Sequence, residues 1–268
     1  MSIQQHIREQ SSAPAVMVVQ ARRARFRRGR ALKFMALLLA LGCSQDATAP
    51  ADLGTLSFLI VSGNGQSGVV GTELTQPLVV KATKSNGQAL AGVTVTFRVT
   101  SGGGSVFAGA ATTGTNGIAQ DYWTLGTSTA DLEQLEVRAV LSTGQKQVYG
   151  VFTATPLVGP AAQLVIQAGD GQTAGPSSSV PIAPEVLITD QYGNPVPGWS
   201  VTFAVASGGG SVTGGNATTN ASGIATVGSW TLGPVPGSNT LTANASASGI
   251  AGNPVSFFAI SLGAYTPN

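Results

Sequence analysis

Few residues in this 268-residue chain could carry out covalent or acid–base chemistry. The single histidine, His6, and the single cysteine, Cys43, lie near the N-terminus, so the rest of the chain cannot build a Ser-His or Cys-His nucleophile. Carboxylates alone rarely hold zinc. The nearest set for a glycosidase-like pair is Asp131, Glu133 and Glu136. These residues occupy a turn leading into a strand, where solvated charges are ordinary, so we expect no enzymatic activity.

Three local patterns resemble cofactor or metal sites but lack an essential part. Residues 63–68 fit the spacing GxGxxG, yet the following residues show no helical pattern, and that motif needs a helix N-terminus facing the phosphates. Residues 102–104 are three glycines without the lysine of a P-loop. Asp190 and Asn194 could bind calcium, which takes six to eight oxygens, but an Asx turn explains both. We therefore expect no cofactor and no metal.

Cys43 is predicted to be modified by lipid. A basic run over 22–30 precedes a short apolar run over 34–41, and Gly42-Cys43 follows. The apolar run is shorter than the ~20 residues of a membrane-spanning helix and suits the core of a signal peptide. The junction resembles the lipobox of bacterial lipoproteins, in which the cysteine is diacylated and becomes the new N-terminus. The alternative is an ordinary signal peptide cleaved near Ala49.

The distribution of charge argues against a nucleic-acid partner. Eight of the 13 basic residues lie in the first 33 positions, within the predicted signal peptide. After Cys43, five basic residues stand against ten carboxylates, for a net charge of −5. The sequence pI of about 8.9 therefore describes the leader rather than the body.

The body of the chain consists of two copies of one pattern. Each copy contains an alternating strand, a Ser-Gly-Gly-Gly-Ser-Val segment, a Thr-Thr pair, a Gly-Ile-Ala segment and a Trp-Thr-Leu-Gly segment. Val93, Val95, Phe97 and Val99 alternate with polar residues, the period of a strand with one buried face. Regular short strands separated by turn residues, with no helical period, predict an all-β chain of two β-sandwiches. Trp123, Trp199 and Trp230 fall in strand patterns and are expected in the cores.

The second copy carries motifs that resemble those of bacterial immunoglobulin-like domains of the invasin and intimin type. The matching pieces are 190–198, Val201-Thr202-Phe203, Thr218-Thr219, Gly223-Ile224-Ala225 and Trp230-Thr231-Leu232-Gly233, with a looser match in the first copy. This resemblance implies tandem Ig-like sandwiches that display an adhesive surface away from the cell.

The predicted organisation follows from these observations. Residues 1–42 form a lipoprotein signal peptide, 43–53 a tether, 54–155 the first Ig-like domain (repeat one), 156–160 a linker, 161–262 the second (repeat two) and 263–268 a tail. We expect an exported, non-enzymatic protein of the outer membrane or cell surface. A lipid on Cys43 would hold it to the membrane, and it would serve adhesion, display or structure by binding a protein or glycan.

Two alternative functions remain at this stage. A carbohydrate-binding module would need exposed aromatic residues such as Tyr122, Tyr192 or Tyr265 beside polar groups. An exported enzyme would need carboxylates gathered in a deep pocket.

The binding surface is predicted at the end of repeat two farthest from the lipid. If each repeat has seven strands, the chain enters one end and leaves at the other. The expected loops contain Gly169, Asp170, Gly208, Gly209, Gly210, Pro234, Pro236 and Tyr265. The loop from Asp190 to Pro197 should instead face repeat one. Because repeat two has no Lys or Arg, binding there should depend little on salt.

Overall fold

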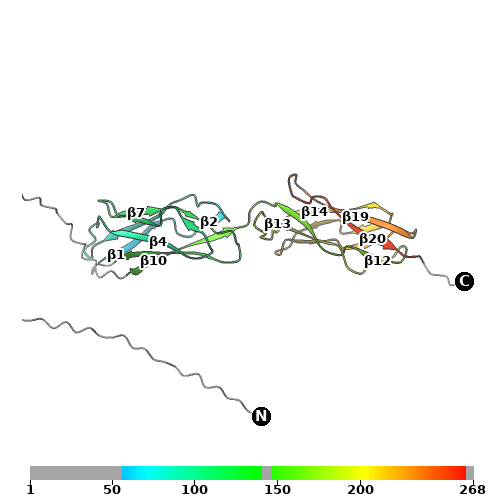
Figure 1. The fold of residues 1–268 in the computed structure, drawn as a ribbon, viewed down its shortest axis with the longest axis horizontal. Coiled ribbons are helices and arrows are strands. Elements are labelled where there is room, and N and C mark those ends of the chain that lie inside the picture. Colours follow the sequence, from blue (N-terminus) through cyan, green and yellow to red (C-terminus); the bar gives the residue numbers. More distant parts are fainter. Residues whose placement is uncertain (1–55, 141–145, 264–268) are drawn as a thin grey trace, which may run out of the picture. The chain divides into compact units, whose positions relative to one another are not determined.

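The computed structural model describes residues 56–140 and 146–263 (Figure 1). All regular secondary structure within these ranges is β-strand. Cys43 and Tyr265 lie outside the described residues. Repeat one contains β1 (Ser57–Ser62), β2 (Gln66–Val69), β3 (Leu78–Thr83), β4 (Thr94–Ser101), β5 (Ser105–Val106), β6 (Ala110–Thr112), β7 (Ile118–Asp121), β8 (Trp123–Thr124), β9 (Glu133–Val140) and β10 (Lys146–Leu157).

Repeat two contains a matching set of strands. They are β11 (Gln163–Ala168), β12 (Gln172–Ala174), β13 (Glu185–Thr189), β14 (Ser200–Ser207), β15 (Ser211–Thr213), β16 (Asn216–Thr218), β17 (Ile224–Thr226), β18 (Ser229–Thr231), β19 (Gly237–Ala245) and β20 (Val255–Ser261). The repeated sequence pattern therefore gives a repeated strand order.

Each repeat folds into two facing sheets with the same topology. In repeat one, β1-β3-β7 form the smaller sheet and β2-β10-β9-β4-β6 the larger one, with β5-β8 as a short extra pair. In repeat two the orders are β11-β13-β17, β12-β20-β19-β14-β16 and β15-β18. These layers confirm the predicted all-β fold with two sandwich-like units.

The first strand of each repeat crosses from the smaller sheet to the larger one. β1 pairs with β3, while β2 pairs in parallel with β10; β11 and β12 repeat this division in repeat two. Gly63 sits at the crossing with a φ of 89°, and a Cβ there would collide with the backbone of Pro77. The Gly-rich 63–68 segment is therefore a strand crossing, and no helix follows it, as the sequence predicted.

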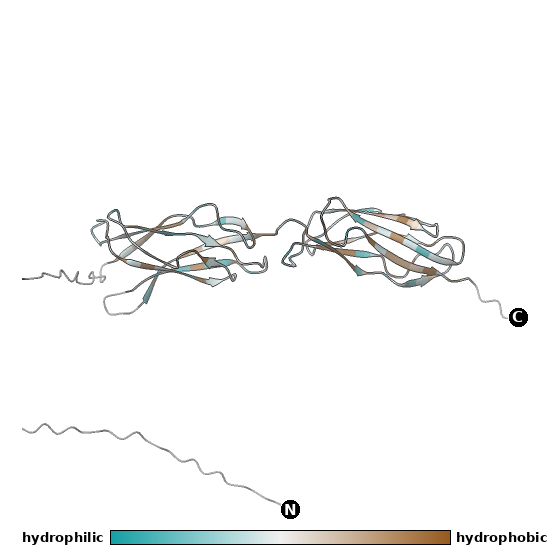
Figure 2. Ribbon diagram, turned by 45° about the horizontal axis from the view of Figure 1, so that its top comes forward, coloured by the Kyte–Doolittle hydropathy of each residue, from teal (hydrophilic) through white to brown (hydrophobic). Residues whose placement is uncertain are grey.

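Each sandwich is filled by its own alternating apolar residues. Val95 and Phe97 are buried on β4, as are Val201 and Phe203 on β14, while the residues between them are more exposed. Figure 2 shows hydrophobic and hydrophilic residues mixed along the strands of both repeats. Trp123 and Phe152 are among the largest fully buried side chains of repeat one, and Trp230 and Phe257 of repeat two. All residues of the two cores lie between positions 56 and 259, so a chain beginning at Ala49 contains both cores complete.

A buried threonine makes the same pair of hydrogen bonds in each repeat. Thr113 Oγ1 donates to Leu90 O at 2.7 Å and accepts from Val93 N at 3.0 Å. Thr219 Oγ1 donates to Val196 O at 2.7 Å and accepts from Trp199 N at 2.8 Å. The second threonine of each Thr-Thr pair thus joins the start of a long strand to the chain segment before it, so the repeated motif has a structural role.

One strand runs beyond its predicted domain. β10 continues to Leu157, and its last two residues pair with Gly68 and Val69 of β2. Pro156 is tolerated there because the pairing of β10 with β9 ends at Ala154, so only β2 lies beside the proline.

Candidate functional site

The loops predicted to form the outer surface of repeat two divide into two groups. Gly208, Gly209 and Gly210 pack against the segment around Gly233 and Pro234. Ser177 N donates to Gly233 O at 3.1 Å, and the segment near Pro236 lies beside Gly263. These loops therefore gather at the end of repeat two where β20 finishes.

Gly169 and Asp170 lie apart from that group. Gly169 packs against Pro184, and Asp170 Oδ1 accepts a hydrogen bond from Phe258 N at 2.7 Å, in the middle of β20. They belong to the crossing between β11 and β12. The structure thus brings together Gly208, Gly209, Gly210, Pro234 and Pro236, and places Gly169 and Asp170 on the flank of the larger sheet.

Asn239 positions the outer loops, although the sequence patterns did not single it out. Its buried side chain accepts a hydrogen bond from Gly233 N at 3.0 Å and donates to Gly237 O at 3.1 Å. Gly208 lies directly against this amide. Aligning the two repeats could have revealed the position, because Asn239 corresponds to Glu133, which binds Gly126 N in the same way at 2.7 Å.

The carboxylates considered for catalysis do not form a site. Glu133 is completely buried, and Glu136, three residues along the same strand, points to the opposite face and pairs with Arg138. Burial raises the pKa of Glu133, the hydrogen bond from Gly126 lowers it, and the nearby charge of Asp131 raises it further; the net shift is upward. Glu133 Oε2 has no hydrogen-bond partner within the described structure. A buried carboxyl without access to substrate cannot act as a general acid or nucleophile.

Asp190 is the centre of a hydrogen-bonded turn. Its carboxylate accepts hydrogen bonds from Gly159 N, Tyr192 N, Asn194 N and Asn194 Nδ2 at 2.9 to 3.1 Å. Burial alone would raise the pKa of Asp190, but these hydrogen bonds outweigh it and lower the pKa. Both carboxylate oxygens face N–H donors, so they are committed to the turn. No group of three or more His, Cys, Asp or Glu side chains suited to a metal occurs in the described part of the chain.

The loop that begins at Asp190 contacts repeat one. Asn194 Nδ2 donates to Thr127 O at 2.8 Å, and Asn194 Oδ1 accepts from Thr129 N at 3.0 Å. The phenol of Tyr192 lies against Gly71. One amide therefore joins the Asp190 turn to a loop of repeat one, in agreement with the prediction that the loop from Asp190 to Pro197 faces repeat one.

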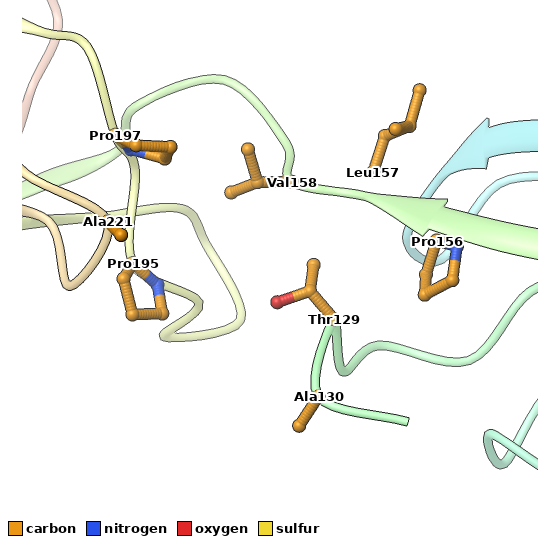
Figure 3. Close-up of a pocket in the computed structure, with 8 residues that line it drawn as sticks. All are labelled: Thr129, Ala130, Pro156, Leu157, Val158, Pro195, Pro197 and Ala221. Carbon is orange, nitrogen blue, oxygen red and sulfur yellow. The ribbon is translucent and has the colours of Figure 1, made fainter. Parts of the chain in front are cut away.

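A hollow of about 450 Å³ lies beside this contact (Figure 3). Its walls are uncharged and mostly apolar, and they consist of Thr129, Ala130, Pro156, Leu157, Val158, Pro195, Pro197 and Ala221. Only Thr129 offers a side-chain hydrogen-bonding group there. The hollow can accommodate apolar groups, but its lining supplies no acid, base or nucleophile.

Within the described residues, tyrosines and tryptophans do not come together as a sugar-binding platform. Trp123 and Trp230 are fully buried, as predicted for core residues, and Trp199 packs partly buried against the core of repeat two. Tyr122 and Tyr192 are exposed but lie in different repeats. None of the described segments forms a helix that could cross a bilayer.

Comparisons with known proteins show similarity of fold. No protein-family model and no curated protein matches the chain. The FdeC adhesin of Escherichia coli is 19% identical with a TM-score of 0.44, covering 76% of this chain and 64% of that one. The D00-D0 domain of intimin is 15% identical with a TM-score of 0.37, covering 77% and 99%. The adhesin InvE of Yersinia pseudotuberculosis is 18% identical with a TM-score of 0.34, covering 80% and 61%.

The likeness to these structures concerns the arrangement of strands alone. This chain spans less than two thirds of the FdeC and InvE structures that it matches. No statement about function follows from identities at this level.

Proposed function

We propose that this protein is a non-enzymatic, lipid-anchored module of the cell envelope whose tandem Ig-like domains serve adhesion, display or structure. The observation that carries the proposal is what the two repeats have in common. Both keep the buried apolar residues and the threonine hydrogen bonds, while Arg98, Glu133 and Glu136 correspond to Ala204, Asn239 and Thr242. A catalytic or metal site common to the two repeats would require the polar residues to be kept in both, whereas a display scaffold requires only the fold.

The membrane anchor in this proposal is a lipid on Cys43. Its support is the order of a basic run, a short apolar run and Gly42-Cys43, all of it from the sequence. In this organisation 1–42 is removed, 43–53 is the tether, 54–155 and 161–262 are the domains, 156–160 links them and 263–268 is the tail. The protein would then reside at the outer membrane or cell surface.

Mass spectrometry of the protein purified from its source membranes tests the anchor. We expect an N-terminal peptide that begins at Cys43 and carries acyl chains. The variant Cys43→Ser should appear in the soluble fraction, with its two domains folded as before. An unmodified peptide that begins at Met1 or Pro50 contradicts the anchor.

The proposed contact with a protein or glycan ligand lies at the outer loops of repeat two. Its support is that Gly208, Gly209, Gly210, Pro234 and Pro236 gather at one end, with Val235 exposed beside them. No charged residue occurs in 205–211 or 232–238. Binding there would rest on backbone and hydroxyl hydrogen bonds and on apolar contact, and so would change little with salt.

Binding of the chain from Ala49 to intact source cells, at low and high salt, tests this surface. One variant replaces 208–210 and 234–237 by Gly-Ser links, and a control variant replaces 220–222 at the other end of repeat two. We expect salt-insensitive binding that only the first variant loses. Salt-sensitive binding that survives the first replacement contradicts the proposed surface.

A further inference from the structure

The outer face of the larger sheet differs in character between the two repeats. In repeat two, the five strands β12, β20, β19, β14 and β16 contain no charged residue. In repeat one, the corresponding sheet carries Arg98 and Glu136, which lie directly opposite each other on β4 and β9. The matching pair in repeat two is Ala204 and Thr242. The outer face of the larger sheet in repeat two therefore lacks the charged side chains that hydrate the corresponding face of repeat one.

An apolar ridge runs along one side of this uncharged face. Phe258, Ile260 and Leu262 alternate with buried residues at the end of the chain, and they are 58%, 50% and 54% exposed. A small hollow of about 120 Å³ adjoins Phe258 and Ile260. Threonine occupies the position in repeat one that matches Phe258, so the repeated fold does not require an aromatic residue there.

The opposite side of the same face is shallow. Ala204 and Ala206 point outward from β14, and both are exposed. Between the ridge and these alanines, β19 presents the hydroxyl groups of Ser238, Thr240 and Thr242. Thr242 pairs with Ala204 on one side and Ser256 on the other. The surface thus has a ridge and a trough that run parallel, with a row of hydroxyl groups between them.

From this relief we infer that the outer face of β20, β19 and β14 is where two copies of the chain associate. A two-fold axis along β19 would place the ridge of one copy over the trough of its partner, and the reverse. Phe258, which is level with Thr240 in the sheet, would then lie over the partner's β14 at Ala206 and Ser207, and the β19 hydroxyl rows would face each other at the axis. A self-complementary contact of this kind is what two-fold symmetry requires.

The absence of charge favours a second copy over a charged partner. Two such faces can meet without desolvating an ion and without repulsion, and depletion of charge is typical of interface centres. Asp170 is a charged residue at the edge of this face, and its Oδ1 accepts a hydrogen bond from Phe258 N. A basic or acidic partner would find no opposite charge on these strands.

The size of the face predicts a weak dimer. The strands β20, β19 and β14 have seven, nine and eight residues and lie about 4.8 Å apart, which gives roughly 400 Å² per copy. A standard stable interface buries about 800 Å² per partner. Association should therefore appear only at high local concentration, on the order of 100 µM, as on a crowded cell surface.

Sedimentation equilibrium of the chain from Ala49 tests the inference, over roughly 5 to 500 µM protein. We expect a reversible monomer–dimer equilibrium that is unchanged between low and high salt. Phe258→Asp should shift the dissociation constant at least about tenfold toward monomer, because it places a charge on the ridge. Thr153→Asp, at the matching position of repeat one, should leave it unchanged. Melting curves establish that both variants are folded.

A charge-exchange pair tests the arrangement about the axis. Phe258→Lys and Ala206→Glu should each be monomeric alone, because each places an unpaired charge in both symmetry-related halves of the contact. An equimolar mixture should form a heterodimer, since the lysine of one copy faces the glutamate of the other. This outcome requires β20 to lie over β14 of the partner.

Three results would overturn the inference. The first is a monomer at every concentration, and the second is a dimer that persists in Phe258→Asp. The third is a monomer that binds neutral polysaccharide from the source envelope through Phe258, which would assign the face to a glycan. Failure of the dimer leaves the outer-loop binding assay unaffected, because that assay measures attachment to cells by loops outside this face.

Discussion

The two repeats share one fold, yet they solve the same structural problem with different chemistry. In both, a buried polar side chain on a long strand binds the backbone of the Trp-Thr-Leu-Gly segment. Repeat two uses the amide of Asn239, whose two hydrogen bonds satisfy both of its ends. Repeat one uses the carboxyl of Glu133, which leaves Oε2 buried without a partner. The position shared by Glu133 and Asn239 needs a side chain that accepts a hydrogen bond from a glycine N–H, and that side chain does not have to be charged.

The same contrast holds on the surface. Repeat one covers its larger sheet with Arg98, Glu136 and Arg138, while repeat two presents Ala204, Thr242 and Asn244. The two repeats therefore differ in surface charge on this sheet, while their strand order and buried positions correspond. Experiments that separate the repeats will test this account.

The largest expected effect comes from emptying one core. Phe203 is buried and packs against Phe257 with ring centroids 6.3 Å apart. Phe203→Ala should lower the free energy of unfolding of repeat two by about 3–5 kcal/mol. Hydrogen exchange resolved by peptide should show lost protection in repeat two alone. Phe97→Ala should do the converse in repeat one, and an equal loss in both repeats would show that they unfold as one unit.

The next effect comes from the buried threonines. Thr219→Val keeps the shape of the side chain but leaves Val196 O and Trp199 N without their partner, so it should cost about 1–3 kcal/mol. Thr219→Ser, which keeps the hydroxyl, should cost less. Chemical denaturation of the three proteins measures the difference. A valine variant as stable as the parent would show that the hydroxyl plays no part in stability.

A smaller effect separates the repeats by pH. Because the pKa of Glu133 is raised by folding, the native state binds its proton more tightly, so lowering the pH from 7 toward about 4.5 should stabilise repeat one. Glu133→Gln should remove this dependence, since it replaces the titrating carboxyl by an amide. The lowered pKa of Asp190 acts oppositely in repeat two, whose stability should fall below pH ~4.

Urea unfolding monitored by repeat-specific hydrogen exchange at pH 7, 5 and 3 follows both trends. If repeat one of Glu133→Gln still became more stable on acidification by the same amount, another titratable group would be responsible for the pH dependence.

The smallest effect is expected from the surface ion pair. Arg138→Ala removes the pairing with Glu136, which is partly exposed and screened by solvent, so the cost should be at most about 0.5 kcal/mol. Asn244→Ala, at the matching position of repeat two, should be similarly mild. A loss above about 1 kcal/mol for Arg138→Ala would mean that the charged face contributes to stability as well as to solubility.

Much of the fold could be predicted from the sequence because it depends on local, repeated signals. The alternation from Val93 to Val99 identifies a strand with one buried face, and its recurrence 106 residues later identifies a second domain. The buried tryptophans follow from the same pattern. The lack of a histidine or cysteine after Cys43 likewise removes most nucleophilic chemistry without any coordinates.

Other features depended on which strands become neighbours, and only the tertiary structure decided them. Gly169 and Asp170 read as an end loop, yet the strand crosses between sheets there and brings Asp170 to Phe258. In the sequence, Phe258, Ile260 and Leu262 show only the alternation of an ordinary strand. Their role in an uncharged face depends on Ala204 and Thr242, which are distant in sequence but belong to the same sheet. Alternation tells which residues point the same way along one strand. Pairing decides what lies beside them, and that depends on the whole chain.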